Sequence, residues 1–288
     1  MKKNFWDKEW TDLLRKEEKY IYKHCVESTN FLAKLQKIVP DGLQSKLDAA
    51  FIKAFQLIFD KGTIVIEKTY NKEKRQSEYK VREYAASIRE DKQNVRAFRK
   101  KAAGYARKNL FISSAEGIGL GLLGVGLPDI PLFVSVMLRN LYEISLSFGY
   151  DYDRMEERFF QLKIIEIALY SGEEMQARDE DMNVMCQSIC GSKQREDNET
   201  LRIAGDINEQ IRKTAKALSD DMLYAKFLQG QPIVGAIGGA MDMTVLNRIS
   251  TYAMLKYRRR YLLDRKWKEE QAEQDDIVLK NQEEKEEA

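Results

Sequence analysis

The segment of residues 117–138 (GIGLGLLGVGLPDIPLFVSVML) constrains the fold of this chain more than any other, because its only charged residue is Asp129. A helix that crosses a membrane needs about 20 consecutive apolar residues, and the segment is long enough. Pro128 and Pro131 interrupt it, however, and would expose backbone groups and the charge of Asp129 to hydrocarbon. We therefore expect a glycine-rich helical hairpin near the centre of the chain, lying in a membrane surface or packed inside the protein.

The glycines of this segment fit two spacing patterns. Residues 119–124 have the GxGxxG spacing of dinucleotide-binding loops, but that fingerprint needs a preceding strand, which the sequence does not indicate. Gly117 and Gly121 also have small-xxx-small spacing, which recurs at Gly235 and Gly239 and lets two helices approach backbone to backbone. Such close packing serves a membrane protein and a water-soluble bundle equally, so both interpretations stay open.

The rest of the chain has the apolar periodicity of helices. Apolar and aromatic residues recur at steps of three and four between residues 5 and 38. Pro131 stands where the first turn of a helix tolerates proline, and Gly149 is placed to end the same helix. Asp153 and Glu156 have the spacing of a capping box for the next helix. Because no series of strands appears, the sequence predicts an all-α fold, a single multi-helix bundle domain.

We expect three parts along the chain. Residues 1–100 form an N-terminal helical region, and residues 101–268 form a helical core that packs with it as one unit. Residues 269–288 form a charged tail that ends in EEKEEA and offers few apolar residues to bury, so we expect it to be frayed helix or disordered.

The cysteines indicate a reducing compartment, because three cysteines in a long chain do not make a disulfide framework. Residues 1–20 are too charged for a signal peptide, which also favours the cytoplasm. Cys186 and Cys190, with His24 and Cys25, are of the types that bind zinc. The typical zinc spacings are absent, so buried apolar cysteines are favoured, and we expect neither a metal nor a cofactor.

Local basic clusters indicate partners better than total charge does, because 48 basic and 46 acidic residues leave a formal charge of only +2. Basic surfaces with interleaved aromatics attract lipid head groups and nucleic-acid phosphates, and Tyr and Trp favour a membrane interface. A solvent-exposed helix face balanced by neighbouring acids is the alternative. The basic cluster of residues 96–108 lies beside the apolar segment and therefore favours a membrane as partner. We expect no nucleic acid as partner. The candidate membrane or partner surface consists of Arg99, Lys100, Lys101, Leu122, Leu123, Val125, Leu127, Arg258, Arg259 and Arg260.

Candidate catalytic residues are few, since His24 is the only histidine. Asp129, Arg139, Glu143 and Asp242 form a candidate polar network. Arg139 and Glu143 are one helical turn apart on an otherwise apolar helix, so we expect them to pair with each other. Capping and pairing explain these residues better than catalysis, and no catalytic residue is assigned.

Several short motifs occur in a characteristic order between about residues 103 and 260. They are the glycine run of residues 117–126, the LPDIP that follows it, Arg139, FGYD at residues 148–151, EER at residues 156–158, PIVGA at residues 232–236, and Arg258. This combination resembles the EcsC protein family. The family takes its name from a bacterial protein encoded beside an ABC transporter, so the resemblance implies a membrane partner and no particular chemistry. Residues 1–100 and the charged tail are not covered by it.

The favoured function is therefore that of a non-enzymatic, cytoplasmic, membrane-associated helical protein. It is expected at the inner face of the cell membrane, with an anionic membrane surface or a membrane protein such as a transporter as partner. A soluble helical interaction module with internal glycine-rich packing segments is the alternative, and an uncharacterised hydrolase is less favoured.

Overall fold

The computed structural model describes residues 5–25, 41–62, 66–67, 70–88, 129–190, 206–228 and 240–286. Every regular element in these ranges is a helix, which confirms the all-α prediction. The elements are α1 (Phe5–Cys25), α3 (Asp41–Leu57), the π-helical turn η1 (Ile58–Gly62), α5 (Lys72–Ile88), α7 (Asp129–Ser147), α8 (Met155–Leu169), α9 (Gly172–Ser188), α11 (Ile207–Leu228) and α12 (Ala240–Glu286).

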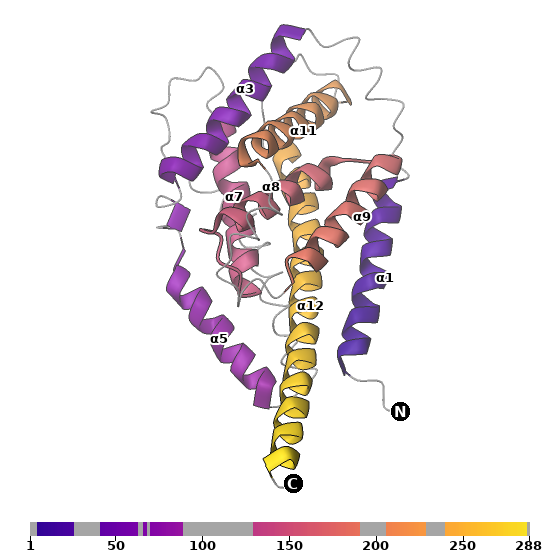
Figure 1. Cartoon of the computed structure of the whole chain (residues 1–288). Coiled ribbons are helices and arrows are strands. Elements are labelled where there is room, and N and C mark those ends of the chain that lie inside the picture. The colour runs from indigo at the N-terminus through magenta and orange to yellow at the C-terminus, as the bar shows by residue number, and fades with distance from the viewer. Residues whose placement is uncertain are drawn as a thin grey trace.

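Helix α12 is the centre of the bundle, since α1, α7, α8 and α9 all pack against it (Figure 1). Helix α11 packs across α8 and α3, and α5 packs against α7. The N-terminal helices α1 and α3 thus contact helices of the C-terminal half, whereas the expected boundary at residue 100 lies outside the described residues. The division into domains therefore stays a prediction.

The C-terminal part of α12 extends beyond the other helices in Figure 1. The chain is helical through Glu286, so the structure shows the helical one of the two states expected for the tail from residue 269. Extending a helix that is already nucleated in the core costs little. Charged side chains at four-residue spacing, such as Lys266 and Glu270 with 3.7 Å between Nζ and Oε1, support this exposed part.

Helix α7 begins at Asp129, with Pro131 in its first turn as predicted. Ile130, Val134 and Leu138 are fully buried, so the second half of the apolar segment belongs to the core of the protein. This half is thus packed inside the protein, which is one of the two interpretations that the sequence left open. The glycine-rich first half, with Leu122, Leu123, Val125 and Leu127, lies outside the described residues, as do Arg99, Lys100 and Lys101.

Gly149 ends α7, as the sequence indicates. Its φ of 79° is a left-handed conformation, and the amide of Tyr150 donates to the carbonyl of Ser145 in the pattern of a helix C-cap. An added Cβ would lie 2.3 Å from the ring of Tyr79 on α5. Both the backbone conformation and the close approach of α5 therefore require glycine here.

The start of α8 differs from the expected capping box. The N-cap is Arg154, and its side chain makes no cap hydrogen bond. The carboxylate of Asp153 instead accepts a hydrogen bond from Lys72 of α5. The side chain of Asp153, which the local spacing predicts as a cap of α8, therefore forms an ion pair with α5 instead.

Among the described residues, no helix combines the length and the apolar character needed to cross a membrane.

Candidate functional site

The basic run of α12 lies inside the protein. Lys256 is fully buried, and Arg258, Arg259 and Arg260 are between 4% and 6% exposed. The expectation that these three arginines form a membrane or partner surface is therefore wrong. Consecutive residues of a helix point about 100° apart, so the run reaches acidic side chains on several neighbouring helices.

Lys256 and Arg259 join α12 to α1 and α9. The Nζ of Lys256 lies 3.0 Å from Oε1 of Glu17 and 2.7 Å from Oδ1 of Asp179. The guanidinium of Arg259 binds both carboxylate oxygens of Glu17, at 3.0 and 2.5 Å. Tyr252 also donates to Asp179 at 2.8 Å, so three helices are joined by one buried network.

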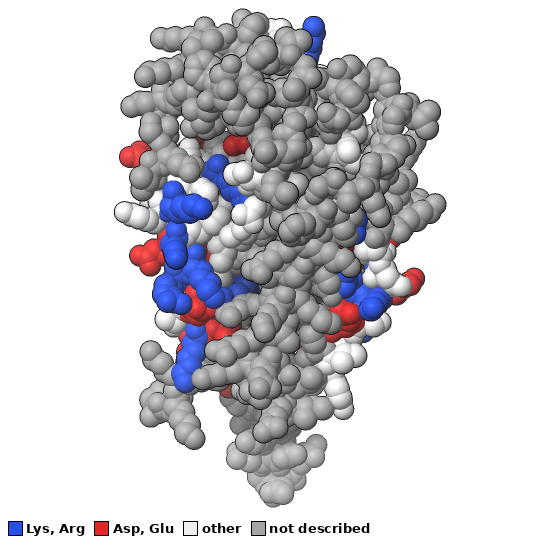
Figure 2. Space-filling view, turned by 180° about the vertical axis from the view of Figure 1, so that it is seen from behind, with Lys and Arg blue, Asp and Glu red and all other residues white. Residues whose placement is uncertain are grey.

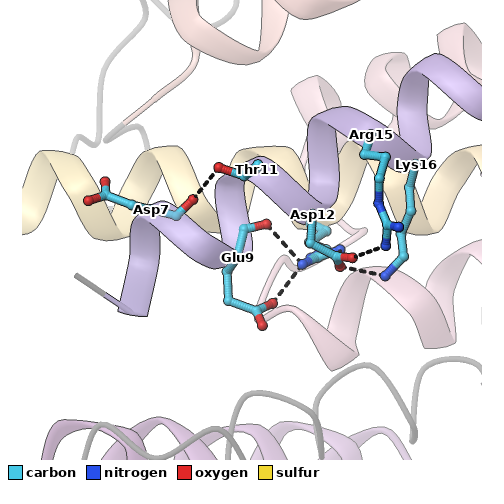
Figure 3. A network of polar contacts seen from close by, with 7 residues as sticks. Asp7, Glu9, Thr11, Asp12, Arg15 and Lys16 are labelled. Atoms are coloured by element: carbon cyan, nitrogen blue, oxygen red, sulfur yellow. Dashed lines mark hydrogen bonds and ion pairs between the residues drawn. The ribbon is translucent and has the colours of Figure 1, made fainter. Parts of the chain in front are cut away.

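Arg258 reaches the N-terminal part of α1. Its guanidinium lies 2.6 Å from Oε2 of Glu9 and 3.0 Å from Oδ2 of Asp12. Figure 3 shows Arg15 and Lys16 turned toward Asp12. Their nitrogens lie 3.0 and 2.5 Å from the carboxylate oxygens of Asp12. Partial burial alone would raise the pKa of Asp12, but the hydrogen bonds from Lys16, Arg15 and Arg258 hold it well below its ordinary value.

Arg260 points toward α8. Its guanidinium lies 2.8 Å from Oε2 of Glu157, and its central carbon lies 4.0 Å and 4.2 Å from the ring centres of Tyr150 and Phe160. Burial lowers the pKa of Arg260, but the charge of Glu157, its hydrogen bond and the nearby Tyr150 and Tyr257 together raise the pKa above the ordinary value. Each buried cation of this run is thus neutralised by an acid, which is the condition for placing charges in a core.

The outer face of α1 carries exposed cations at seven- and four-residue steps, and we name this set, Lys8, Arg15, Lys19 and Lys23, the α1 basic face. Such steps place side chains on one side of a helix. Figure 2 shows Lys and Arg side chains gathered in a column on the flank where α1 lies. Tyr22, with 71% of its surface exposed, lies beside this face.

Sequence reasoning missed the α1 basic face because α1 also carries Asp7, Glu9, Asp12, Glu17 and Glu18, and its charges look balanced. The structure turns Glu9 and Glu17 into the core, where α12 neutralises them. A helical projection with Leu13 facing inward would have found the face, since Lys8, Arg15 and Lys19 project together away from Leu13.

The polar stripe of α7 consists of Ser135, Arg139, Glu143 and Ser147 at four-residue steps, and these side chains are buried or half-buried. Nε of Arg139 lies 3.4 Å from Oε1 of Glu143, which confirms the predicted pairing. Arg75 of α5 approaches the other oxygen of Glu143 at 3.6 Å, and Glu143 is 1% exposed. The side chains of Asp129 and Asp242 lie outside the described residues, so their part in this network stays a prediction.

The cysteines do not assemble into a metal site in the described part of the chain, where no group of three or more His, Cys, Asp or Glu residues is placed to hold an ion. Cys25 donates to the carbonyl of Gly172 at 3.2 Å. Burial raises the pKa of Cys186 to about 12. Burial, with a smaller contribution from the nearby Asp264, also raises the pKa of Cys190 to about 12. Neither of these thiols is ionised near neutral pH, as an activated nucleophile would be.

The sequence model of the EcsC protein family matches residues 8–262. The chain belongs to the EcsC protein family. The match begins in α1, so this EcsC chain shares the N-terminal helices with its family, although the sequence resemblance left residues 1–100 out. The last part of α12 lies beyond the match.

Two curated relatives of this EcsC chain come from Bacillus subtilis (strain 168). Uncharacterized protein YdbA is 24% identical over 167 residues, which is 57% of this chain and 58% of that protein. Protein EcsC is 32% identical over 62 residues, which is 21% of this chain and 26% of that protein. The matches thus cover less than two thirds of either relative. No solved structure matches the chain.

Proposed function

We propose that this EcsC-family chain is a non-enzymatic helical protein that binds peripherally to an anionic membrane surface, at the inner face of the cell membrane. The observation that carries the proposal is the α1 basic face, whose cations are exposed on one side of an outer helix with Tyr22 beside them. Lysine and arginine attract anionic head groups, and tyrosine favours the interface.

The strength of this contact follows from the number of cations. Each Lys or Arg near an anionic membrane surface contributes about 1 kcal/mol. Arg15 is shared with Asp12, so Lys8, Lys19 and Lys23 give on the order of 3 kcal/mol. That corresponds to weak and reversible binding, and a stable attachment needs a second contact. Arg99, Lys100 and Lys101 with the apolar Leu122, Leu123, Val125 and Leu127 supply this second contact in the proposal.

The non-enzymatic part of the proposal is supported by the polar groups of α7. Glu143 faces Arg139 and Arg75, and the hydroxyls of Ser135 and Ser147 donate to carbonyls of their own helix at 2.7 Å. These groups satisfy one another, as a structural network does.

The proposal is tested by sedimentation of the chain with vesicles. Phosphatidylglycerol vesicles are expected to carry down more protein than phosphatidylcholine vesicles, and added salt is expected to reduce the bound fraction, because salt screens exposed charges. Replacing Lys8, Lys19 and Lys23 by Gln is expected to weaken binding to the anionic vesicles. Equal binding to both kinds of vesicle contradicts the proposal.

A matched control is available on α11. Arg212, Lys213 and Lys216 are also exposed cations on an outer helix, and their replacement by Gln changes the net charge of the protein by the same amount. We expect this control variant to bind like the unchanged protein. An equal loss in both triple variants means that total charge, and not the α1 basic face, drives binding.

A second candidate function, a water-soluble interaction module, is favoured by the burial of Ile130, Val134 and Leu138. The second half of the apolar segment is therefore buried in the core of the protein. This candidate predicts that neither kind of vesicle carries the protein down.

A further inference from the structure

A groove of about 440 Å³ runs between α1 and α9, which lie side by side in Figure 1. The α1 wall includes Leu14, Ile21 and Tyr22, and the α9 wall includes Gln176 and Glu180. The groove is open to solvent and lies beside the α1 basic face, but its own lining is mainly acidic.

The floor of the groove is the buried network described above. Glu17, Asp179 and Arg259 line it, with Lys256 directly beneath, and each of these four residues is less than 9% exposed. Since Lys256 and Arg259 neutralise Glu17 and Asp179, the floor is fixed by ion pairs between three helices. A molecule bound in the groove therefore contacts a floor whose side chains are held in fixed positions.

The α1 rim of the groove is apolar and exposed, and an exposed apolar residue of α9 lies next to the other rim. Leu14 and Tyr22 on α1 are 43% and 71% exposed. Val184, which is 61% exposed, follows Glu180 by one turn on the same side of α9. Large apolar side chains exposed together on two adjacent helices mark a contact surface.

The charge of the lining selects the occupant. Glu17, Glu18, Asp179 and Glu180 line the groove, and Arg259 with the underlying Lys256 balances two of these four carboxylates. Glu18 and Glu180, one on each wall, are exposed and remain in excess. An anionic ligand such as a lipid head group is disfavoured by these two carboxylates, whereas Lys and Arg side chains are favoured.

We propose that this groove binds a short amphipathic helix of a partner protein, with apolar side chains between the rims and Lys or Arg side chains against Glu18 and Glu180. Helices that lay an apolar face into a groove are a common mode of peptide recognition. The inference differs from membrane binding in the charge that it uses, although Tyr22 borders both surfaces.

The test uses two synthetic fluorescent peptides of helical Leu periodicity, one with Lys and one with Glu at the polar positions. Fluorescence anisotropy with the full chain, in the absence of vesicles, is expected to show binding of the Leu/Lys peptide only. Replacing Leu14 and Tyr22 by Ser is expected to weaken that binding about tenfold, because exposed apolar anchors carry most of the energy of such contacts. Equal affinity for both peptides overturns the proposal.

Charge reversal keeps the test decisive if the apolar variant does not fold. The variant Glu18→Lys/Glu180→Lys changes only exposed side chains and is expected to prefer the Leu/Glu peptide. Glu270→Lys/Glu273→Lys, on the exposed part of α12, makes the same change in net charge and is expected to keep the original preference. A reversed preference in both variants overturns the proposal, as does dimerisation of the chain through the groove in sedimentation velocity.

Discussion

Lys256 of α12 and Glu17 of α1 form an ion pair inside the protein, with 3.0 Å between Nζ and Oε1 and with 0% and 6% of their side chains exposed. Arg259 binds the same carboxylate, so Glu17 pairs with two cations that lie far from it in the sequence. The attachment of α1 to the bundle thus depends on charges that are almost fully buried.

Replacing Glu17 by Gln is expected to lower the free energy of unfolding by about 3 kcal/mol, because removing one partner leaves buried charge uncompensated. Urea denaturation monitored by circular dichroism measures this. Glu174→Gln removes the exposed pair with Arg178 on α9 and is expected to cost at most about 0.5 kcal/mol. Similar losses in both variants would show that the buried network does not hold α1.

Asp12 gives the protein a specific pH dependence. Its pKa is lowered in the folded state, so its ion pairs contribute fully above the ordinary value of 3.8 and are lost as pH falls below it toward the folded value. We expect Asp12→Asn to be less stable than the unchanged protein at about pH 6, with a difference that shrinks toward about pH 2. Unfolding curves of both proteins across this range measure it, and a constant difference contradicts the assignment.

Gly149→Ala is expected to destabilise the protein by about 1 to 3 kcal/mol, because the left-handed backbone conformation is strained for alanine. The new Cβ would also meet the ring of Tyr79 at 2.3 Å. Gly42→Ala is the control, since an added Cβ there meets nothing within 4 Å. A thermal melt in which both variants behave alike is incompatible with the close contact between α5 and the end of α7.

Glu143→Gln tests the enzyme alternative. We expect lower stability, since Arg139 and Arg75 lose their shared carboxylate. We also expect no phosphatase, esterase or nucleotidase activity in either protein. Turnover in the unchanged protein that disappears in a folded Glu143→Gln variant would make the polar stripe of α7 an active site.

The parts of the fold that depend on neighbouring residues could be predicted from the sequence. Pro131 and Gly149 mark the two ends of α7 through backbone geometry alone, and Arg139 with Glu143 pair because one helical turn separates them. Asp153 shows the limit of such reasoning, since Lys72 from a distant helix binds it in place of the expected cap.

The interior position of Arg258, Arg259 and Arg260 could not be predicted in this way. Their partners Glu9, Glu17 and Glu157 lie more than a hundred residues away in the chain, and no local pattern relates them. The same pairing hid the α1 basic face, because Glu9 and Glu17, two of the acids that balance α1 in the sequence, are turned into the core.

Lysine acetylation followed by mass spectrometry tests the central claim, that α1 meets the membrane, most directly and without any substitution. With phosphatidylglycerol vesicles present, Lys8, Lys19 and Lys23 are expected to be modified more slowly than without them, while Lys213 and Lys216 of α11 keep their rates. Unchanged rates at the three α1 lysines, or equal protection of the two α11 lysines, would contradict the account.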